Sequence, residues 1–248
     1  MIKRLALALA IFVSTPALAF DLNAMSDDER TAFRAEIRSY LLENPQVIME
    51  AVSVLEQREQ AAKLANDVTL AQNYQGQLTN DGHSYVGGNP EGDITIVEFL
   101  DYRCGYCKKA FPEVEQLIAQ DGNIRIIIKE FPILGDASTL ASSFAIAVKD
   151  IAGDAAYKNI HDALMAFNGD VSETALRRLS DTFGYDTAAI FDRMASPEVA
   201  AVINDNRLLG QAMQITGTPT FVVQDQMLRG YVPLAQMMQI VAAIRQKG

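Results

Sequence analysis

The sequence predicts an α/β fold with a helical insertion, preceded by a helical extension. Three observations lead to this prediction. An apolar strand, a helix and a second apolar strand follow one another between residues 94 and 129. Residues 136–214 carry only helical signals, and strand character returns after them. A strand–helix–strand unit completed by a hairpin and a last helix forms a small mixed sheet.

The N-terminus has the pattern of a signal peptide. Lys3 and Arg4 precede an apolar run, and Ala17-Leu18-Ala19 supplies the small residues of a cleavage site. The run is too short to cross a bilayer of roughly 30 Å, and no later stretch has the ~18 apolar residues of a membrane helix. We expect residues 1–19 to be removed on export, without membrane insertion; an uncleaved N-terminal anchor is the alternative.

Composition excludes some classes of partner. Of the 21 Lys and Arg residues, two lie in the predicted signal peptide, which leaves 19 against 31 acidic residues and a net charge of −12. Such a surface repels nucleic acid and anionic lipid. The hydrophobic share of 49% is large enough to fill a core.

Residues 20–75 are predicted to form a helical extension. Ser26 and Glu29 have capping-box spacing, and apolar residues then recur at helical intervals. Asn44-Pro45 breaks the helix and provides an N-cap and a first residue for a second one. Charged Arg58 and Glu59 interrupt the two apolar seams of that helix, so the coiled-coil pattern is incomplete.

Glycine and proline residues mark a linker near residue 76, and we place the start of a second domain there, residues 76–248. The glycine and proline residues of this segment are Gly76, Gly82, Gly87, Gly88, Pro90 and Gly92. Ile94 to Leu100 is almost wholly apolar and rich in β-branched residues, as in a strand buried on both faces, and Glu98 is the exception. A helix from Cys104 to Gln120 and a strand from Ile124 to Lys129 follow.

The rest of the chain completes the fold. Residues 136–214 are predicted as the helical insertion, with breaks at Gly153, Asn168-Gly169, Gly184 and Pro197. Thr220 to Val223 and Met227 to Tyr231 are strands around a turn at Asp225-Gln226, and Leu234 to Gln246 is an amphipathic helix.

The chain has two cysteines, Cys104 and Cys107, in a C-x-x-C motif that begins a helix after a buried strand. As a structural staple, a disulfide across so small a loop would contribute only roughly 2 kcal/mol. A thiol at a helix N-terminus has a lowered pKa, which favours the thiolate. We therefore predict that Cys104 is the exposed nucleophile, that Cys107 is the buried resolving thiol, and that their disulfide is the redox group, with no other cofactor.

Two segments, Phe99 to Cys107 and Thr216 to Phe221, resemble the DsbA family of periplasmic thioredoxin-like proteins, and the similarity covers about residues 84 to 246. The resemblance implies a thioredoxin-like fold and a periplasmic thiol-disulfide oxidoreductase. Its clients would be unfolded or mispaired secreted proteins, and a membrane protein would be its redox partner. The extension, with Glu43-Asn44-Pro45, resembles the ScsC-like branch, linked to copper tolerance. That likeness implies a homo-oligomer, with a trimer favoured, built through residues 20–75.

The resemblance also assigns roles to single residues. Thr218-Pro219 matches the cis-proline loop, which binds substrate backbone beside the cysteines. Glu98 matches the buried acid beneath them, whose raised pKa would suit proton exchange with Cys107; an edge-exposed Glu98 is the alternative. Pro112 matches the kink of the active-site helix.

The dipeptide between the cysteines indicates whether the protein oxidises client thiols or reduces and rearranges client disulfides. Strongly oxidising DsbA proteins have a histidine there, whereas this chain has Gly105-Tyr106, the dipeptide found in periplasmic disulfide isomerases. We therefore expect an isomerase or reductase, with a primary oxidase as the alternative.

A different class of function also fits two soft thiolates, because Cys104 and Cys107 could bind Cu(I). A closed zinc site has no obvious ligand set, and we expect His83 and His161 to be surface or packing residues. Lys129 is expected to be solvated at a strand end, with steering of the field at the site as the alternative.

Overall fold

The computed structural model describes residues 24–246, so the predicted signal peptide lies outside the described residues. The chain divides into two compact units, the first ending at Arg58 and the second comprising Glu59–Gly248. The described part of the chain has no helix that is both long and apolar enough to cross a membrane.

The first unit contains α1 (Asp27–Glu43) and the beginning of α2 (Gln46–Asn73). The predicted capping box is present, because the Glu29 N–H donates to Ser26 Oγ and the Ser26 N–H donates to Glu29 Oε2. Asn44 differs from expectation. It is the C-cap of α1, where its side-chain amide donates to the Tyr40 carbonyl at 3.0 Å, and α2 begins at Gln46 instead of at Pro45.

The end of α2 and a short helix α3 (Gln75–Thr79) belong to the second unit. Ala71 and Leu78 are buried in its core, and Asp67 forms an ion pair with Arg229 at 2.7 Å. The boundary expected near residue 76 therefore falls inside this unit, which begins at Glu59. Gly76 did not mark a linker, because it lies within α3, where a glycine near a helix start is tolerated.

Five strands form one sheet in the order β1-β3-β2-β4-β5. The strands are β1 (Tyr85–Gly88), β2 (Ile94–Leu100), β3 (Ile124–Glu130), β4 (Thr220–Val223) and β5 (Gln226–Arg229). The neighbours β2 and β3 are parallel and are joined by α4 (Gly105–Asp121), whereas every other pair is antiparallel. The predicted strand–helix–strand unit and hairpin are confirmed, and β1 is an additional strand at the edge of the sheet.

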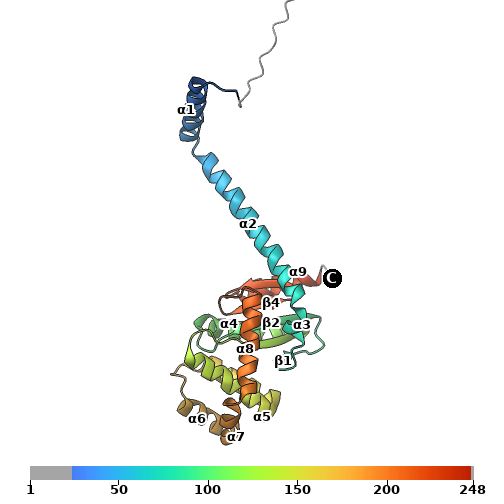
Figure 1. Ribbon diagram of the computed structural model, residues 1–248. Helices are drawn as coiled ribbons and strands as arrows, with labels where there is room; N and C mark the ends of the chain where they lie inside the picture. The colour runs from blue at the N-terminus through green and yellow to red at the C-terminus, as the bar shows by residue number, and fades with distance from the viewer. Residues whose placement is uncertain (1–23, 247–248) are drawn as a thin grey trace, which may run out of the picture. The chain divides into compact units, whose positions relative to one another are not determined.

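The helical insertion is also confirmed. It consists of α5 (Asp136–Ala166), α6 (Glu173–Phe183), α7 (Thr187–Met194) and α8 (Pro197–Ala212), and α9 (Leu234–Arg245) ends the fold. Gly153 kinks α5 with a φ of 84°, a conformation that favours glycine. Figure 1 shows α5, α6 and α7 together at one end of the second unit, with β4 and α9 at the other.

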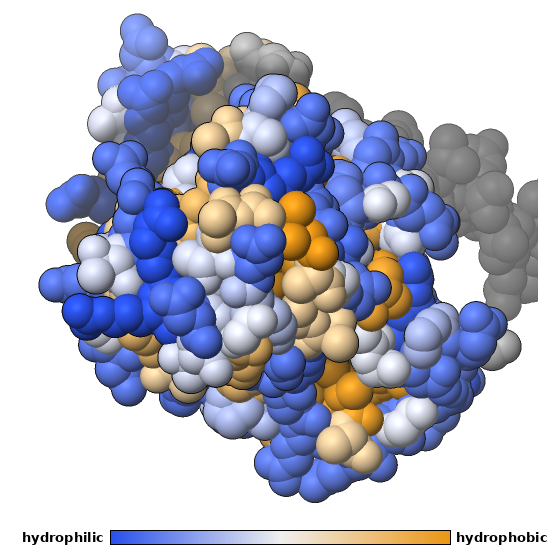
Figure 2. All heavy atoms as spheres, turned by 90° about the horizontal axis from the view of Figure 1, so that it is seen from below, coloured by the Kyte–Doolittle hydropathy of each residue, from blue (hydrophilic) through white to orange (hydrophobic). Residues whose placement is uncertain are grey.

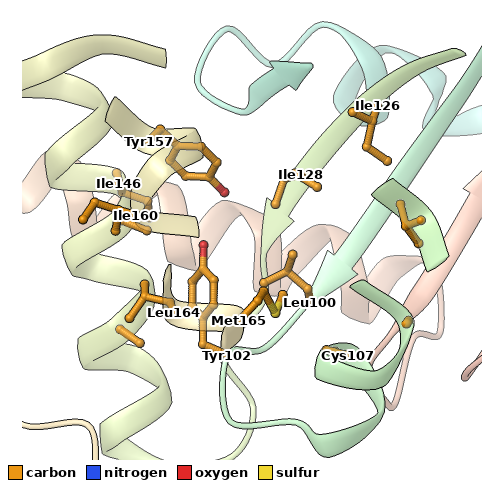
Figure 3. Packing of buried hydrophobic residues seen from close by; sticks show 14 of the residues in the cluster. Leu100, Tyr102, Cys107, Ile126, Ile128, Ile146, Tyr157, Ile160, Leu164 and Met165 are labelled. Atoms are coloured by element: carbon orange, nitrogen blue, oxygen red, sulfur yellow. The ribbon is translucent and has the colours of Figure 1, made fainter. Parts of the chain in front are cut away.

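Two apolar clusters cover the two faces of the sheet. Because side chains alternate along a strand, Ile96 and Leu100 of β2 pack with α4 and α5, while Val97 and Phe99 pack with the end of α2 and with α3. Figure 3 shows part of the first cluster, and the surface in Figure 2 is mainly hydrophilic, with small apolar patches. The same alternation places Glu98 on the α4 side, under the cysteines.

Candidate active site

The C-x-x-C motif lies where β2 gives way to α4. Cys104 is the N-cap of α4, and its N–H donates to the Asp101 carbonyl at 3.0 Å. The Asp101 carboxylate is fully buried and accepts from the N–H groups of Arg103, Ile133 and Leu134 at 2.8, 2.8 and 3.0 Å. Asp101 thereby fixes the turn before Cys104 and ties it to the loop after β3. The contact to Arg103 is an Asx turn, a signal that could have identified this residue from sequence.

Both cysteines are free thiols and both are buried. Cys104 keeps 8% of its surface accessible and Cys107 none. The prediction of an exposed Cys104 was therefore too strong, because the segment Thr218-Pro219 covers it: Cys104 Sγ lies 3.1 Å from the Thr218 carbonyl oxygen. The order of accessibility still agrees with Cys104 as the thiol that meets a client.

The environment of the two thiols separates their pKa values. Hydrogen bonds from the Cys107 thiol, the Thr218 side chain and the N–H groups of Tyr106 and Cys107 outweigh burial and lower the pKa of Cys104 to about 5. For Cys107, burial raises the pKa far above its ordinary value, and its hydrogen bond to Cys104 and the charge of Glu98 act in the same direction. At neutral pH the pair therefore consists of one thiolate and one thiol.

The peptide bond between Thr218 and Pro219 is cis, as expected. The Thr220 hydroxyl donates to the Gly217 carbonyl at 2.8 Å, and the Gly230 N–H donates to the Pro219 carbonyl at 2.8 Å. The first bond closes the loop on itself and the second ties it to the residue after β5, while the Thr218 carbonyl contacts Cys104 at the start of α4.

Glu98 lies on the central strand β2 and is 3% exposed, which excludes the edge-exposed alternative. Burial, then the charges of Glu115 and Cys104, raise the pKa of Glu98 to about 8. None of the residues that the structure describes bonds to Glu98 Oε1, a buried atom. A carboxyl in this position can hold or release a proton near neutral pH.

The dipeptide and Pro112 also lie where the motif placed them. Tyr106 is 64% exposed, and open space surrounds the Gly105 Cα, so this side of the site is accessible to a large partner. Pro112 lies inside α4.

Lys129 is placed differently from both expectations. It is fully buried, it pairs with Asp81, and its Nζ donates to the Gln77 carbonyl at 2.7 Å. Because it alternates with Ile128 on β3, it lies on the α3 side of the sheet, opposite to Glu98 and the cysteines. It therefore supports packing, and its charge is already compensated.

The described residues include no cluster of three or more His, Cys, Asp or Glu side chains that could hold a metal ion. His161 is a packing residue: its ring contacts the rings of Tyr102 and Phe111, and burial lowers its pKa to about 3. His83 Nε2 lies 2.9 Å from the Asp81 carboxylate.

A buried polar cluster beside the site was not predicted. The hydroxyls of Tyr102 and Tyr157 both donate to Glu130 Oε1 at 2.6 Å, and Figure 3 shows them pointing toward one another. Burial raises the pKa of Glu130 to about 7. Tyr102 precedes Cys104 by two residues and Tyr157 lies on α5, so the cluster joins the active-site loop to the helical insertion.

Two family profiles match the chain. The family profile described as the DSBA-like thioredoxin domain matches residues 95–242, and the profile of the copper resistance protein ScsC N-terminal domain matches residues 29–62.

Solved structures agree with these matches. A thioredoxin-like oxidoreductase from Silicibacter pomeroyi DSS-3 is 39% identical, with a TM-score of 0.65 over 69% of this chain and 97% of that one. BcfH from Salmonella enterica Typhimurium is 29% identical, with a TM-score of 0.73 over 86% and 94%. Proteus mirabilis ScsC in a compact conformation is 26% identical, with a TM-score of 0.65 over 88% and 98%.

Among curated proteins, the chain is 27% identical over 146 residues to the Na(+)/H(+) antiporter NhaA 3 of Salinispora tropica, but it spans only 22% of that protein's length. It is also 21% identical over 198 residues to disulfide bond formation protein D of Bacillus subtilis, covering 82% of it. With its C-x-x-C motif, cis-proline loop and inserted helices, the chain belongs to the DsbA family of thioredoxin-like thiol-disulfide oxidoreductases, and an ScsC-type N-terminal domain precedes its catalytic domain.

Proposed function

We propose that this protein is a periplasmic disulfide isomerase and reductase that acts on unfolded or mispaired secreted proteins. The observation that carries the proposal is the difference in ionisation and accessibility between the two sulfurs. Cys104 is an ionised nucleophile with accessible surface, and Cys107 is a buried thiol one helical turn further on. A pair of this kind attacks a client disulfide and then releases the client.

The surroundings of Cys104 support a protein as the substrate. The Thr218-Pro219 loop lies against the sulfur, so a client chain bonded to Cys104 would lie beside this loop. Exposed Tyr106 on the other side offers an apolar contact.

The dipeptide Gly105-Tyr106 supports the isomerase and reductase direction of the reaction. Neither residue carries a positive charge that would further stabilise the Cys104 thiolate, so the reduced form is less favoured than in proteins with a histidine there. A weaker oxidant can return electrons to a client and rearrange its disulfides. A membrane protein would keep Cys104 and Cys107 reduced.

The first unit supports assembly into a homo-oligomer, and we favour a trimer. Apolar side chains on α1 and the start of α2 are exposed, among them Phe33, Ile37, Tyr40, Ile48, Val52 and Leu55. In each helix the three lie at i, i+4 and i+7, on one face, and a second and third copy of the chain would cover them.

Two assays without added metal test the proposal. The first follows the precipitation of insulin as its disulfides are reduced, and the second follows the recovery of scrambled RNase. We expect both activities in the protein and neither in Cys104→Ser. Cys107→Ser should form a stable mixed disulfide with the client, because the resolving thiol is missing. Insulin reduction without RNase recovery would leave a reductase and remove the isomerase.

Copper binding is a second candidate, favoured by the match to the copper resistance protein ScsC domain. Residues 29–62, where that match lies, contain neither cysteine nor histidine, so the two thiols of the catalytic domain would have to supply the Cu(I) ligands. Competition with a chromogenic Cu(I) chelator tests it. A Cys104→Ser variant that competes as well as the unchanged protein would remove this function.

A further inference from the structure

Arg229 on β5 connects the two ends of the loop that lies against Cys104. This loop, residues 213–219, joins α8 to β4 and contains the cis peptide bond. At its first end, the Arg229 guanidinium donates to the Gln214 carbonyl at 2.6 Å and to the Met213 carbonyl at 3.4 Å. One side chain therefore binds two successive carbonyls where the loop begins.

The same part of β5 also holds the second end of the loop. Arg229 pairs with Thr220, the first residue of β4, and the N–H of the next residue, Gly230, donates to the Pro219 carbonyl at 2.8 Å. The loop is therefore closed at both ends by two successive residues, and the segment beside Cys104 lies between these ends.

The backbone of the loop requires support at Gln214. Its φ is 55°, in the left-handed region that residues with a side chain seldom adopt. Such a conformation persists where the surrounding contacts fix it. The Gln214 N–H donates to the Gln211 carbonyl at 3.0 Å, and the Gln214 carbonyl accepts from Arg229, so the backbone is held on both sides of this residue. Arg229 thus helps to fix the direction in which the chain leaves α8.

Asp67, in the last two turns of α2, fixes the orientation of Arg229. Its carboxylate oxygens accept from Arg229 Nη2 at 2.7 Å and from Nε at 3.3 Å, which is a bidentate arrangement. The Asp67 side chain is 5% exposed, so loss of this pairing would leave a charge unpaired in the interior. The pairing leaves Nη1 of Arg229 directed at the Gln214 carbonyl.

Packing alone is the competing explanation for the position of the loop. Met213 and Ile215 are buried in the apolar cluster that includes Val97 and Phe99, and the Ile215 N–H donates to the Gly210 carbonyl at 2.8 Å. These contacts anchor the loop only where it begins. The bonds of Arg229 and its neighbour reach both ends, so the two explanations predict different results for a change at Asp67.

We propose that Asp67 and Arg229 are positioning residues for client capture, because their ion pair fixes the cis-proline loop where it meets the peptide chain of a client bonded to Cys104. The inference rests on the proposed function, since only a protein client brings a peptide chain to this loop. It gives the end of α2 a role at the active site. A protein without this pair should keep a reactive Cys104 and bind client chains less tightly.

The test compares a disulfide that carries a peptide chain with one that does not. The reduced full-length protein is mixed with an extended peptide that holds a fluorescent group through a disulfide, and separately with dithionitrobenzoate, an aromatic disulfide without peptide bonds. Both reactions are run at about pH 6, between the pKa of about 5 for Cys104 and the pKa of about 8.5 for a free thiol. A fast reaction with dithionitrobenzoate therefore reports a folded site.

We expect Asp67→Asn to lower the second-order rate with the peptide on the order of tenfold, through weaker binding, and to leave the rate with dithionitrobenzoate within about twofold. Arg229→Lys should have the same effect. It keeps the positive charge, but an ammonium group does not reproduce the planar fork that binds the carboxylate and the loop carbonyls together.

The matched control is Asp121→Asn. Asp121 also binds an arginine through two bonds, to Arg245 at 2.6 Å each, but this pair joins α4 to α9 and not to the cis-proline loop. Both rates should stay within about twofold of those of the unchanged protein, because the loop keeps its supports.

An unchanged rate with the peptide in Asp67→Asn and Arg229→Lys would overturn the inference and leave packing as the cause of the loop position. An equal loss of both rates would also overturn it, because the pair would then stabilise the fold as a whole. So would a loss confined to one of the two variants, since the pair is proposed to act as a unit. The proposed function fails separately, and the inference with it, if the unchanged protein reacts with dithionitrobenzoate and not with the peptide.

Discussion

The ionisation of Glu98 is tied to the charge on Cys104. The Cys104 thiolate is one of the charges that raise the pKa of Glu98, and that charge disappears when Cys104 enters a mixed disulfide with a client. The pKa of Glu98 then falls toward neutral pH, at the stage when Cys107 has to lose its proton. We therefore expect Glu98 to be protonated more often in the free reduced protein than in the mixed disulfide.

The low pKa of Cys104 gives the first prediction. Alkylation of the reduced protein by iodoacetamide should rise with pH around a midpoint near 5, because only the thiolate reacts. Peptide mapping should find the label on Cys104 alone. Faster labelling of Cys107 would reverse the assigned roles.

The raised pKa of Glu98 gives a prediction about stability. The unfolded chain loses this proton near pH 4.5 and the folded protein near pH 8, so the stability that depends on this group is complete below 4.5 and falls as the pH rises to about 8. Glu98→Gln removes that fall. In denaturant unfolding of the reduced proteins, the variant should match the unchanged protein at pH 4 and exceed it at pH 8, by up to about 4 kcal/mol. An equal difference at both pH values would contradict the shift.

Tyr106→His tests the role of the dipeptide. A partly cationic ring beside Cys104 stabilises its thiolate and with it the reduced form, so the potential should become less negative. A tenfold change in the equilibrium with glutathione corresponds to roughly 30 mV, and we expect a change of that order. An unchanged or more negative potential would remove the main support for the isomerase over the oxidase.

Residues carried by a recognisable motif were predictable, and those whose surroundings depend on distant segments were not. The cysteines were found from their spacing at the start of a helix, and the roles of Glu98 and Pro219 from the resemblance to the DsbA family. Lys129 was misjudged because its compensating partners, Gln77 and Asp81, lie 52 and 48 residues away along the chain. No local pattern indicates that a lysine at the end of a strand will be fully buried.

At the scale of elements, the strands and helices with strong periodicity were predicted nearly to the residue. The sequence indicated Ile94 to Leu100, which is β2, and Leu234 to Gln246, which corresponds to α9 (Leu234–Arg245). The elements that were missed, β1 and α3, contain Gly87, Gly88 and Gly76, which read as breaks. Their structure depends on packing, since β1 pairs with β3 and α3 buries Leu78.

The end of α2 should be part of the catalytic domain in stability as well as in structure. A fragment starting at Glu59 should fold and keep insulin reduction, whereas one starting at Gly76 loses Ala71 from the core and leaves Arg229 without Asp67. The shorter fragment should be less stable by about 3 kcal/mol or more, because removal of one partner of a largely buried pair costs that amount. Thermal unfolding of the two fragments compares them, and equal midpoints would place the boundary near residue 76 after all.

At the scale of the molecule, the described residues of the first unit, 24–58, form no core of their own. In α1 none of the residues is buried, and the buried residues of α2, Asp67 and Ala71, both belong to the second unit. Helices in water gain most of their stability from packing of an apolar face, so α1 and the start of α2 need a surface to cover theirs. Arg58 and Glu59, which interrupt the seams, coincide with the division between the units.

The last prediction is that residues 20–58 assemble the protein and that assembly serves isomerisation. Several active sites held around one client can capture a mispaired disulfide at high effective concentration, whereas simple reduction needs only one site. Light scattering should give an oligomer, with a trimer favoured, for the mature protein and a monomer for the fragment starting at Glu59. That fragment should keep insulin reduction and lose most of the recovery of scrambled RNase.

As a matched change within the whole chain, Ile48→Glu with Val52→Glu places charges on the apolar face of α2 without shortening it, and should have the same two effects. A monomeric mature protein, or a monomeric variant that still repairs RNase at the full rate, would show that the extension has another role.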